Sequence, residues 1–168
     1  SPDQTVVYPA QGVGIVERLE QRDIGGMTAE FYIIRILTNN ITVMVPVKNA
    51  VAVGLRTLCT PQEAADVLAF MQDRSGFTGY TGQNWNRRYR EYTERLKSSS
   101  LFDVGHVLKE LILISAEKDL SFGERRLMEQ AMGLISTELG CVLQRESETV
   151  KAEIESFFAD ILIKPAVE

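Results

Sequence analysis

The pattern of apolar and polar positions changes near residue 58. Before it, apolar residues occur in short runs of strand-forming types, at 5–8, 12–19, 31–37 and 41–46. The pairs Gly25-Gly26 and Asn39-Asn40 separate the later runs, where tight turns with positive φ are expected. Four or five short antiparallel strands in so few residues predict a small curled barrel of the SH3 or Tudor kind.

After residue 58 the apolar repeat becomes helical. Thr60-Pro61-Gln62-Glu63 and Ser121-Phe122-Gly123-Glu124 are capping boxes, which mark helix starts. The first helix has one apolar face and then meets a run of glycines: Ala64, Val67, Leu68 and Met71, then Gly76, Gly79 and Gly82. Later helices are predicted over 83–97, 101–115, 122–139 and 147–162.

The predicted fold class is therefore α+β with two domains. Residues 1–57 form a small antiparallel β barrel and residues 58–168 a compact all-helical domain. A hydrophobic fraction of 45% and a charged fraction of 24% are typical of a globular protein. With two distant cysteines, no signal peptide and no apolar run of ~18 residues, we expect a cytoplasmic monomer with free thiols that does not enter a membrane.

Signals of catalysis are weak. Gly12-Val13-Gly14 resembles the start of a dinucleotide-binding loop, but the third glycine is missing and no helix is predicted to follow. His106 is the only histidine, and no cysteine or carboxylate lies at metal-ligand spacing from it. The carboxylates within 146–160 are typical of a solvated helix face. We therefore predict a protein that is not an enzyme and uses no metal and no cofactor.

Positive charge is concentrated around the single tryptophan. The net charge of the chain is −5, yet residues 84–97 carry five basic and two acidic side chains, a local charge of +3. Guanidinium groups beside an aromatic ring suit a nucleic-acid backbone and a base step. The segment Trp85-Asn86-Arg87-Arg88-Tyr89-Arg90-Glu91-Tyr92 is thus a candidate DNA contact.

The same segment also fits a helix that packs on a core. Its aromatic and apolar residues recur at helical spacing: Trp85, Tyr89, Tyr92 and Leu96. Tryptophan is usually buried, and periodicity alone favours that interpretation. However, Arg88 interrupts the stripe, and a first-turn residue can project beyond the body on which its helix packs. The arginines are then either phosphate contacts or an ordinary solvated surface.

The strands predicted at 31–37 and 41–46 are apolar on both faces, although a barrel of this size has one interior. Along the first strand two apolar sets alternate: Phe31, Ile33 and Leu37 against Tyr32, Ile34 and Ile36. Either the second face packs on the helical domain, or an exposed face or edge binds another protein. The pattern does not decide which face is outside.

Two groups of motifs, in order over about residues 5–160, are similar to one known family. The first group is Val7-Tyr8-Pro9, Gly12-Val13-Gly14, Phe31-Tyr32-Ile33-Ile34-Arg35-Ile36-Leu37, Met44-Val45-Pro46 and Val53-Gly54-Leu55-Arg56. The second is the Trp85 segment and Lys118-Asp119-Leu120-Ser121-Phe122-Gly123-Glu124-Arg125. On these motifs the chain resembles the CarD/CdnL family of bacterial transcription factors, which bind RNA polymerase.

The resemblance implies that the first domain is Tudor-like and docks on the RNA polymerase β subunit. Ile34, Met44 and Pro46 match family positions that meet the polymerase, and Arg22 matches a basic position that some members use there. Met44 and Pro46 share one face of their strand, which would be the outer one. Some relatives have arginine where this chain has Met44, so its contact should be more apolar and less sensitive to salt.

The resemblance also implies that the helical domain reaches promoter DNA at the upstream edge of the melted region. The family's tryptophan wedges at the minor groove there, which makes Trp85 the wedge and makes Arg87, Arg88 and Arg90 candidate phosphate contacts. The glycine-containing stretch 76–82 is expected to alter the lead into the Trp85 helix. An Arg-Gly-Arg-Pro hook and an ATPase motif, found in some longer relatives, are absent from this sequence.

A wedge of this kind favours DNA that is already open. Inserting it into duplex DNA costs a few kcal/mol of stacking, which a promoter opened by polymerase has already lost. We expect promoter DNA to be bound weakly by the protein alone and usefully only on the polymerase. The alternatives are a protein–protein adaptor whose helical domain does not touch DNA, and a regulator that binds a small ligand between the domains.

Overall fold

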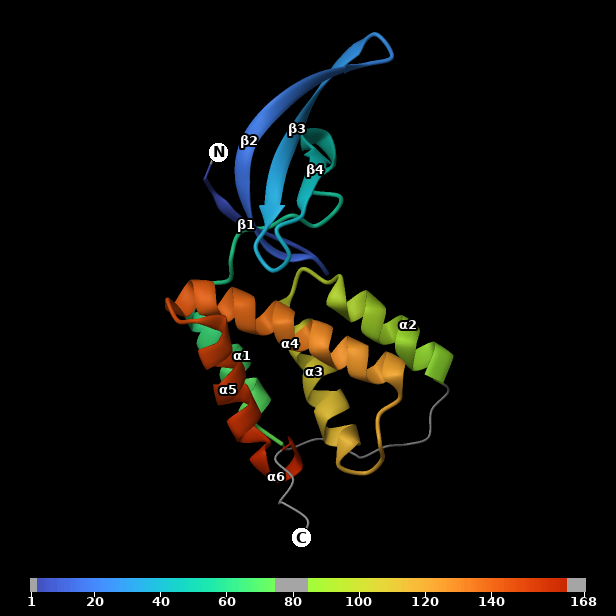
Figure 1. Cartoon of the computed structure of the whole chain (residues 1–168), viewed down its shortest axis with the longest axis vertical. Coiled ribbons are helices and arrows are strands. Elements are labelled where there is room, and N and C mark those ends of the chain that lie inside the picture. The colour runs from blue at the N-terminus through green and yellow to red at the C-terminus, as the bar shows by residue number, and fades with distance from the viewer. Residues whose placement is uncertain (1–2, 75–84, 163–168) are drawn as a thin grey trace. The chain divides into compact units, whose positions relative to one another are not determined.

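The computed structural model describes residues 3–74 and 85–162, with only the backbone for Trp85, and divides into the units Ser1–Leu58 and Cys59–Glu168 (Figure 1). The first unit contains one antiparallel sheet with the order β1-β2-β3-β4. Its strands are β1 (Thr5–Tyr8), β2 (Gly12–Ile24), β3 (Met27–Ile36) and β4 (Thr42–Pro46). Each strand pairs with the next one along the chain, so short turns make every connection.

The β2–β3 hairpin is longer than its apolar pattern predicts. Its outer part contains exposed polar pairs such as Asp23 opposite Thr28. Because backbone hydrogen bonds hold a strand ladder together, these pairs extend the sheet without the apolar alternation that reveals a strand in a sequence. Gly25 and Gly26 form the predicted turn, with φ angles of 59° and 83°.

The sheet curls around a small apolar core and is partly closed by the segment after β4. A short 3-10 turn, η1 (Val47–Asn49), redirects the chain. The Val7 N–H donates to the Arg56 carbonyl with an N···O distance of 2.7 Å, and the Arg56 N–H donates back at 3.1 Å. The core of this half-barrel consists of Val6, Val16, Ile34, Ile36 and Val45.

The second unit is built from helices that begin close to the predicted positions. In chain order they are α1 (Pro61–Gln72), α2 (Trp85–Leu96), α3 (Leu101–Ser115), α4 (Phe122–Leu143), α5 (Ser147–Phe157) and α6 (Ala159–Leu162). Thr60 and Ser121 form both predicted capping boxes. The half-barrel followed by helices confirms the two-domain α+β fold class. The glycines predicted to break the first helix, Gly76, Gly79 and Gly82, lie outside the described residues.

Two helix ends differ from the prediction. Helix α4 runs four residues past position 139, to Leu143, and Gln144 then adopts a left-handed conformation with φ 55°. The helix predicted over 147–162 is divided into α5 and α6, because Phe158 leaves the helical region at φ −123° and ψ 29°. The ring of Phe158 is fully buried, so the break turns an aromatic side chain into the core.

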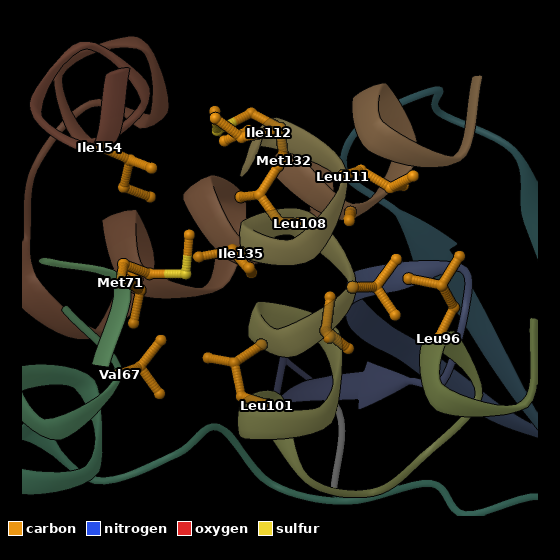
Figure 2. Close-up of a cluster of buried hydrophobic side chains, with 14 of the residues drawn as sticks. Val67, Met71, Leu96, Leu101, Leu108, Leu111, Ile112, Met132, Ile135 and Ile154 are labelled. Atoms are coloured by element: carbon orange, nitrogen blue, oxygen red, sulfur yellow. The ribbon is translucent and has the colours of Figure 1, made fainter. Parts of the chain in front are cut away.

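Helix α3 is the centre of the helical unit. It packs against α1, α2 and α4, and most of its residues from Leu101 to Ile114 are buried. Figure 2 shows Leu101, Leu108 and Ile112 of α3 among apolar side chains from the other helices, including Met71, Ile135 and Ile154. Full burial of each such side chain contributes about 1.5–3 kcal/mol relative to exposure. Helix α2, which is mostly polar, packs on this core.

A test of the half-barrel is Gly14→Ala. A Cβ at this position would lie 2.5 Å from Ile34 Cγ2 and 3.1 Å from the Arg35 carbonyl oxygen. Because Ile34 is confined by the core, we expect a loss of about 1–3 kcal/mol in the free energy of unfolding, measured by urea titration with circular dichroism. The control is Gly133→Ala in α4, which meets no atom within 4 Å and should stabilise its helix by about 0.5–1 kcal/mol. An unchanged Gly14→Ala protein would contradict the packing described.

Candidate nucleic-acid and protein-binding surfaces

Helix α2 presents basic side chains to solvent. Arg87 and Arg90 are both exposed. Arg87 Nε lies 3.5 Å from a carboxylate oxygen of Glu91, but both side chains are largely in water, so the pair contributes little and Arg87 can turn toward another anion. Trp85 is the first residue of α2. Its side chain is outside the described part of the chain, so both interpretations of this tryptophan remain predictions.

The buried side of α2 differs from the predicted stripe. Tyr92 and Leu96 are buried as expected, whereas Tyr89 is 47% exposed. The buried position one turn before Tyr92 belongs to Arg88, which is only 5% exposed. A phosphate contact needs an accessible guanidinium, so the predicted role of Arg88 as a phosphate contact does not agree with its burial. Arg88 is part of the packing of α2 instead.

Arg88 meets a carboxylate from the start of α4. Its Nη2 lies 3.2 Å from Glu124 Oε2, and both side chains are almost fully buried. The other oxygen, Glu124 Oε1, accepts from Lys118 Nζ at 2.8 Å and from the Ser121 backbone N–H at 2.9 Å. One carboxylate therefore joins α2, the loop before α4 and the first turn of α4.

The protonation states in this cluster follow from its surroundings. Burial by itself raises the pKa of the Glu124 carboxyl, but hydrogen bonds from Lys118 and Ser121 and the charge of Lys118 outweigh it, so the pKa lies below the ordinary value of 4.5. Burial, together with nearby Glu110, raises the pKa of the Tyr92 hydroxyl. At neutral pH Glu124 is therefore charged and Tyr92 is neutral.

The first turn of α4 contains exposed residues that the sequence analysis did not assign to a site. Phe122 is 78% exposed, and the Arg126 guanidinium carbon lies 5.8 Å from the centroid of its ring. Arg125 is exposed beside them. The sequence did contain a signal for this surface: as in α2, an aromatic residue at the first helical position is followed by arginines. Since Glu124 bonds to Arg88, this aromatic and basic turn lies beside α2.

The outer face of the sheet, the side away from the half-barrel core, carries most of the predicted polymerase contacts. Met44 pairs with Ile33, and Pro46 pairs with Phe31, so their side chains lie on one face. Arg22 joins this face from β2, because Glu20 pairs with Phe31 and side chains two residues apart share a face. Met44 is 41% exposed and accessible to a partner.

Ile34 is not part of this outer face. It pairs with Val43, one residue out of phase with Met44, and its side chain packs in the half-barrel core with 0% exposure. Alternation along a strand therefore puts Ile34 and Met44 on opposite sides of the sheet. The burial of Ile34 does not agree with a direct contact with the polymerase, which stays a prediction, and its neighbour Ile33 points to the other side of the sheet but is itself only 2% exposed.

The outer face continues to the tip of the β2–β3 hairpin. Ile24 and Met27 form the last pair of the ladder and are 58% and 72% exposed. Basic side chains border this apolar strip along β2, where both Arg18 and Arg22 approach Glu20, at 4.0 and 3.4 Å. The sequence analysis missed Ile24 and Met27, because their pairing depends on the length of the hairpin.

Other kinds of site have little support in the part of the chain that the structure describes. His106 Nε2 lies 3.0 Å from Glu110 Oε2 within α3, and no group of three or more His, Cys, Asp or Glu residues among residues 3–74 and 85–162 could hold a metal ion. An open depression of about 300 Å³ is lined by the charged and polar residues Glu91, Glu94, Arg95, Ser98 and Asp103. Among the described helices, none is long and apolar enough to cross a membrane.

Comparison with known families finds a match in each of the two units. Residues 66–155 match the model of the CarD C-terminal domain, and residues 1–58 match that of the CarD-like/TRCF RID domain. The C-terminal model alone covers more than half of the chain. The chain belongs to the CarD family. Membership of this family indicates a transcription factor that interacts with RNA polymerase.

A curated relative agrees with this placement. The chain is similar to the "Putative transcription factor YdeB" of Bacillus subtilis (strain 168), with 24% identity over 150 residues. The alignment covers 88% of this chain and 94% of the relative. The similarity therefore extends across both units of this CarD-family protein.

The lowered pKa of Glu124 predicts how the stability of the helical unit depends on pH. A carboxyl whose pKa is lower in the folded state stabilises that state above its unfolded pKa, and the effect is lost as pH falls through the folded value. Glu124→Gln should therefore lower the free energy of unfolding by about 1–3 kcal/mol at pH 7, measured by urea titration. The difference from the wild type should narrow below about pH 4.5. A difference that stays constant down to pH 3 would show that the charge of Glu124 is not responsible.

Proposed function

We propose that this CarD-family protein docks on the RNA polymerase β subunit and stabilises the promoter open complex through the Trp85 helix. The observation that carries the proposal is the arrangement of α2. Trp85 is its first residue, and Arg87 and Arg90 are exposed close behind it. The helix is fixed to its domain through Arg88, Tyr92 and Leu96, on the side opposite to Arg87 and Arg90. A helix held in this way can present an aromatic ring and two cations to DNA.

The outer face of the sheet is the proposed docking surface for the polymerase. Met44, Pro46 and Phe31 form its apolar centre, and Ile24 and Met27 extend it to the hairpin tip. Exposed apolar side chains that share one face are typical of protein-binding surfaces. Strand β4 also has only β3 as a partner among the described strands, so main-chain groups at its other edge can pair with a strand of the β subunit.

The proposed DNA-binding surface includes the first turns of both α2 and α4. Arg87 and Arg90 would contact phosphates, while Trp85 would stack against an unpaired base step. Phe122, Arg125 and Arg126 belong to the turn of α4 that contacts α2, because Glu124 in the same turn bonds to Arg88. Cations from two helix starts can follow a phosphate backbone better than one short row. The second turn thereby compensates for the modest charge of the Trp85 segment.

The mechanism rests on a difference in affinity between two promoter states. A protein shifts an equilibrium only by binding one state more tightly than the other. The wedge needs an unstacked step, which open promoter DNA offers and closed duplex DNA does not. Docking on the polymerase raises the effective concentration of the helical unit at the DNA, so weak contacts with DNA are sufficient.

The proposed wedge is tested by Trp85→Ala. We expect the wild-type protein to lengthen the lifetime of a promoter open complex formed by the cognate polymerase, measured after addition of a competitor. A stack of an aromatic side chain on a base, worth about 1–3 kcal/mol, corresponds to roughly a 5- to 150-fold change. Trp85→Ala should lose this effect and still bind the polymerase. If the wild type binds polymerase and leaves the lifetime unchanged, the adaptor alternative replaces the wedge.

The proposed docking surface is tested by Met44→Glu. A carboxylate in the centre of an apolar contact should weaken binding to the isolated β subunit by roughly tenfold or more, measured by titration calorimetry. The matched control is Leu19→Glu, the same kind of change at an exposed residue that pairs with Tyr32 on the opposite face. Equal losses from both substitutions would contradict docking through the outer face.

A further inference from the structure

We propose that the Arg88–Glu124 ion pair is a positioning clamp, which sets the direction of the first half of α2 and so the aim of the wedge. This inference rests on the proposed function only for its consequence at the promoter. The clamp itself is a property of the free protein. Arg88 is a positioning residue in this proposal and does not touch DNA.

The two halves of α2 are attached to the domain in different ways. The second half packs through Tyr92 and Leu96, which belong to the apolar core around α3. Between residues 86 and 91 Arg88 is the sole buried side chain, and every neighbour in that range is exposed. Among the described side chains of this half of the helix, the buried one is therefore a charged residue that pairs with Glu124.

Glu124 is a fixed point for this contact. Its carboxylate already accepts from the Ser121 backbone N–H as part of the α4 capping box, and it also accepts from Lys118. A guanidinium bonds to a carboxylate in a restricted set of directions, unlike an apolar side chain, which can slide over its neighbours. Arg88 is therefore held next to the start of α4.

An ion pair is an unusual choice if stability is the only requirement. Burying two charges is costly, and well-packed apolar residues of similar size often stabilise a protein at least as well. A buried pair can instead select one arrangement among several of similar energy. For α2 that arrangement fixes which way Trp85, Arg87 and Arg90 face. A short helix that lost this buried contact would be less well held in its first half, because the hydrogen bonds of a short helix are marginal by themselves.

The clamp is tested in the free protein by hydrogen exchange. Arg88→Met keeps a side chain of similar length and leaves Glu124 paired with Lys118 and Ser121. We expect the backbone amides of residues 89–92 to exchange roughly tenfold faster or more than in the wild type, while amides of α3 change little. The matched control is Ile154→Val, a buried change on α5, which packs against α4 and α1. It should lower the thermal midpoint without faster exchange at residues 89–92.

The consequence of the clamp is measured on the polymerase. Arg88→Met should bind the polymerase like the wild type and lose most of the lengthening of open-complex lifetime, whereas Ile154→Val should keep it. If Arg88→Met does not fold, Glu124→Gln provides the same comparison, because an amide oxygen can still accept from Ser121. Arg88→Lys, which keeps the charge without the planar fork, should recover part of the exchange protection.

The outcomes separate the clamp from the proposed function. If the wild type does not change the open-complex lifetime, the proposed function fails, and the exchange experiment still decides the clamp. Unchanged exchange at residues 89–92 in Arg88→Met would overturn the clamp. In particular, a lost lifetime effect with unchanged exchange would show that Arg88 turns outward and contacts DNA itself.

Discussion

The placement of helix α2 in the helical unit depends on its contact with the carboxylate of Glu124. Helix α2 is rich in arginine and glutamate, and an apolar core can attach only the part that contains Tyr92 and Leu96. In the preceding turns the described side chain that is buried is the charged Arg88. Because Ser121 and Lys118 already fix Glu124, the ion pair with Arg88 transfers the rigidity of α4 to α2. The charge left exposed on α2 is then displayed from a defined position.

The half-barrel has a small core and differs from the helical unit in how it uses its two faces. Its inner face is closed by a small set of aliphatic side chains, among them Val16, Ile34 and Val45. On the outer face Ile33 is buried, whereas Met44, Ile24 and Met27 are exposed. In the proposed function the two units have separate tasks: the sheet binds a protein partner, and the helices provide cations and aromatic rings. Both units match domain models of the CarD family.

Much of the fold could be predicted from local signals. The capping boxes at Thr60 and Ser121 depend on neighbouring residues only, so these helix starts were found correctly. What the sequence left open depends on tertiary contacts. Ile34 was expected to meet the polymerase from the family resemblance alone, because strand register is a long-range property and the pattern did not show which face is outside. Arg88 was assigned to the surface because a sequence does not show that Glu124, far away in the chain, would bury with it.

Strand β4 has a consequence for the behaviour of the protein in a crowded cell. An edge strand with unpaired backbone groups is a template for the same edge of another copy, and long apolar edges lead to aggregation. β4 is only five residues long, and it ends at Pro46, which has no N–H to donate. Such an edge offers few backbone hydrogen bonds for pairing with the same strand of another copy. The sheet can thus expose apolar side chains without promoting aggregation through this edge strand.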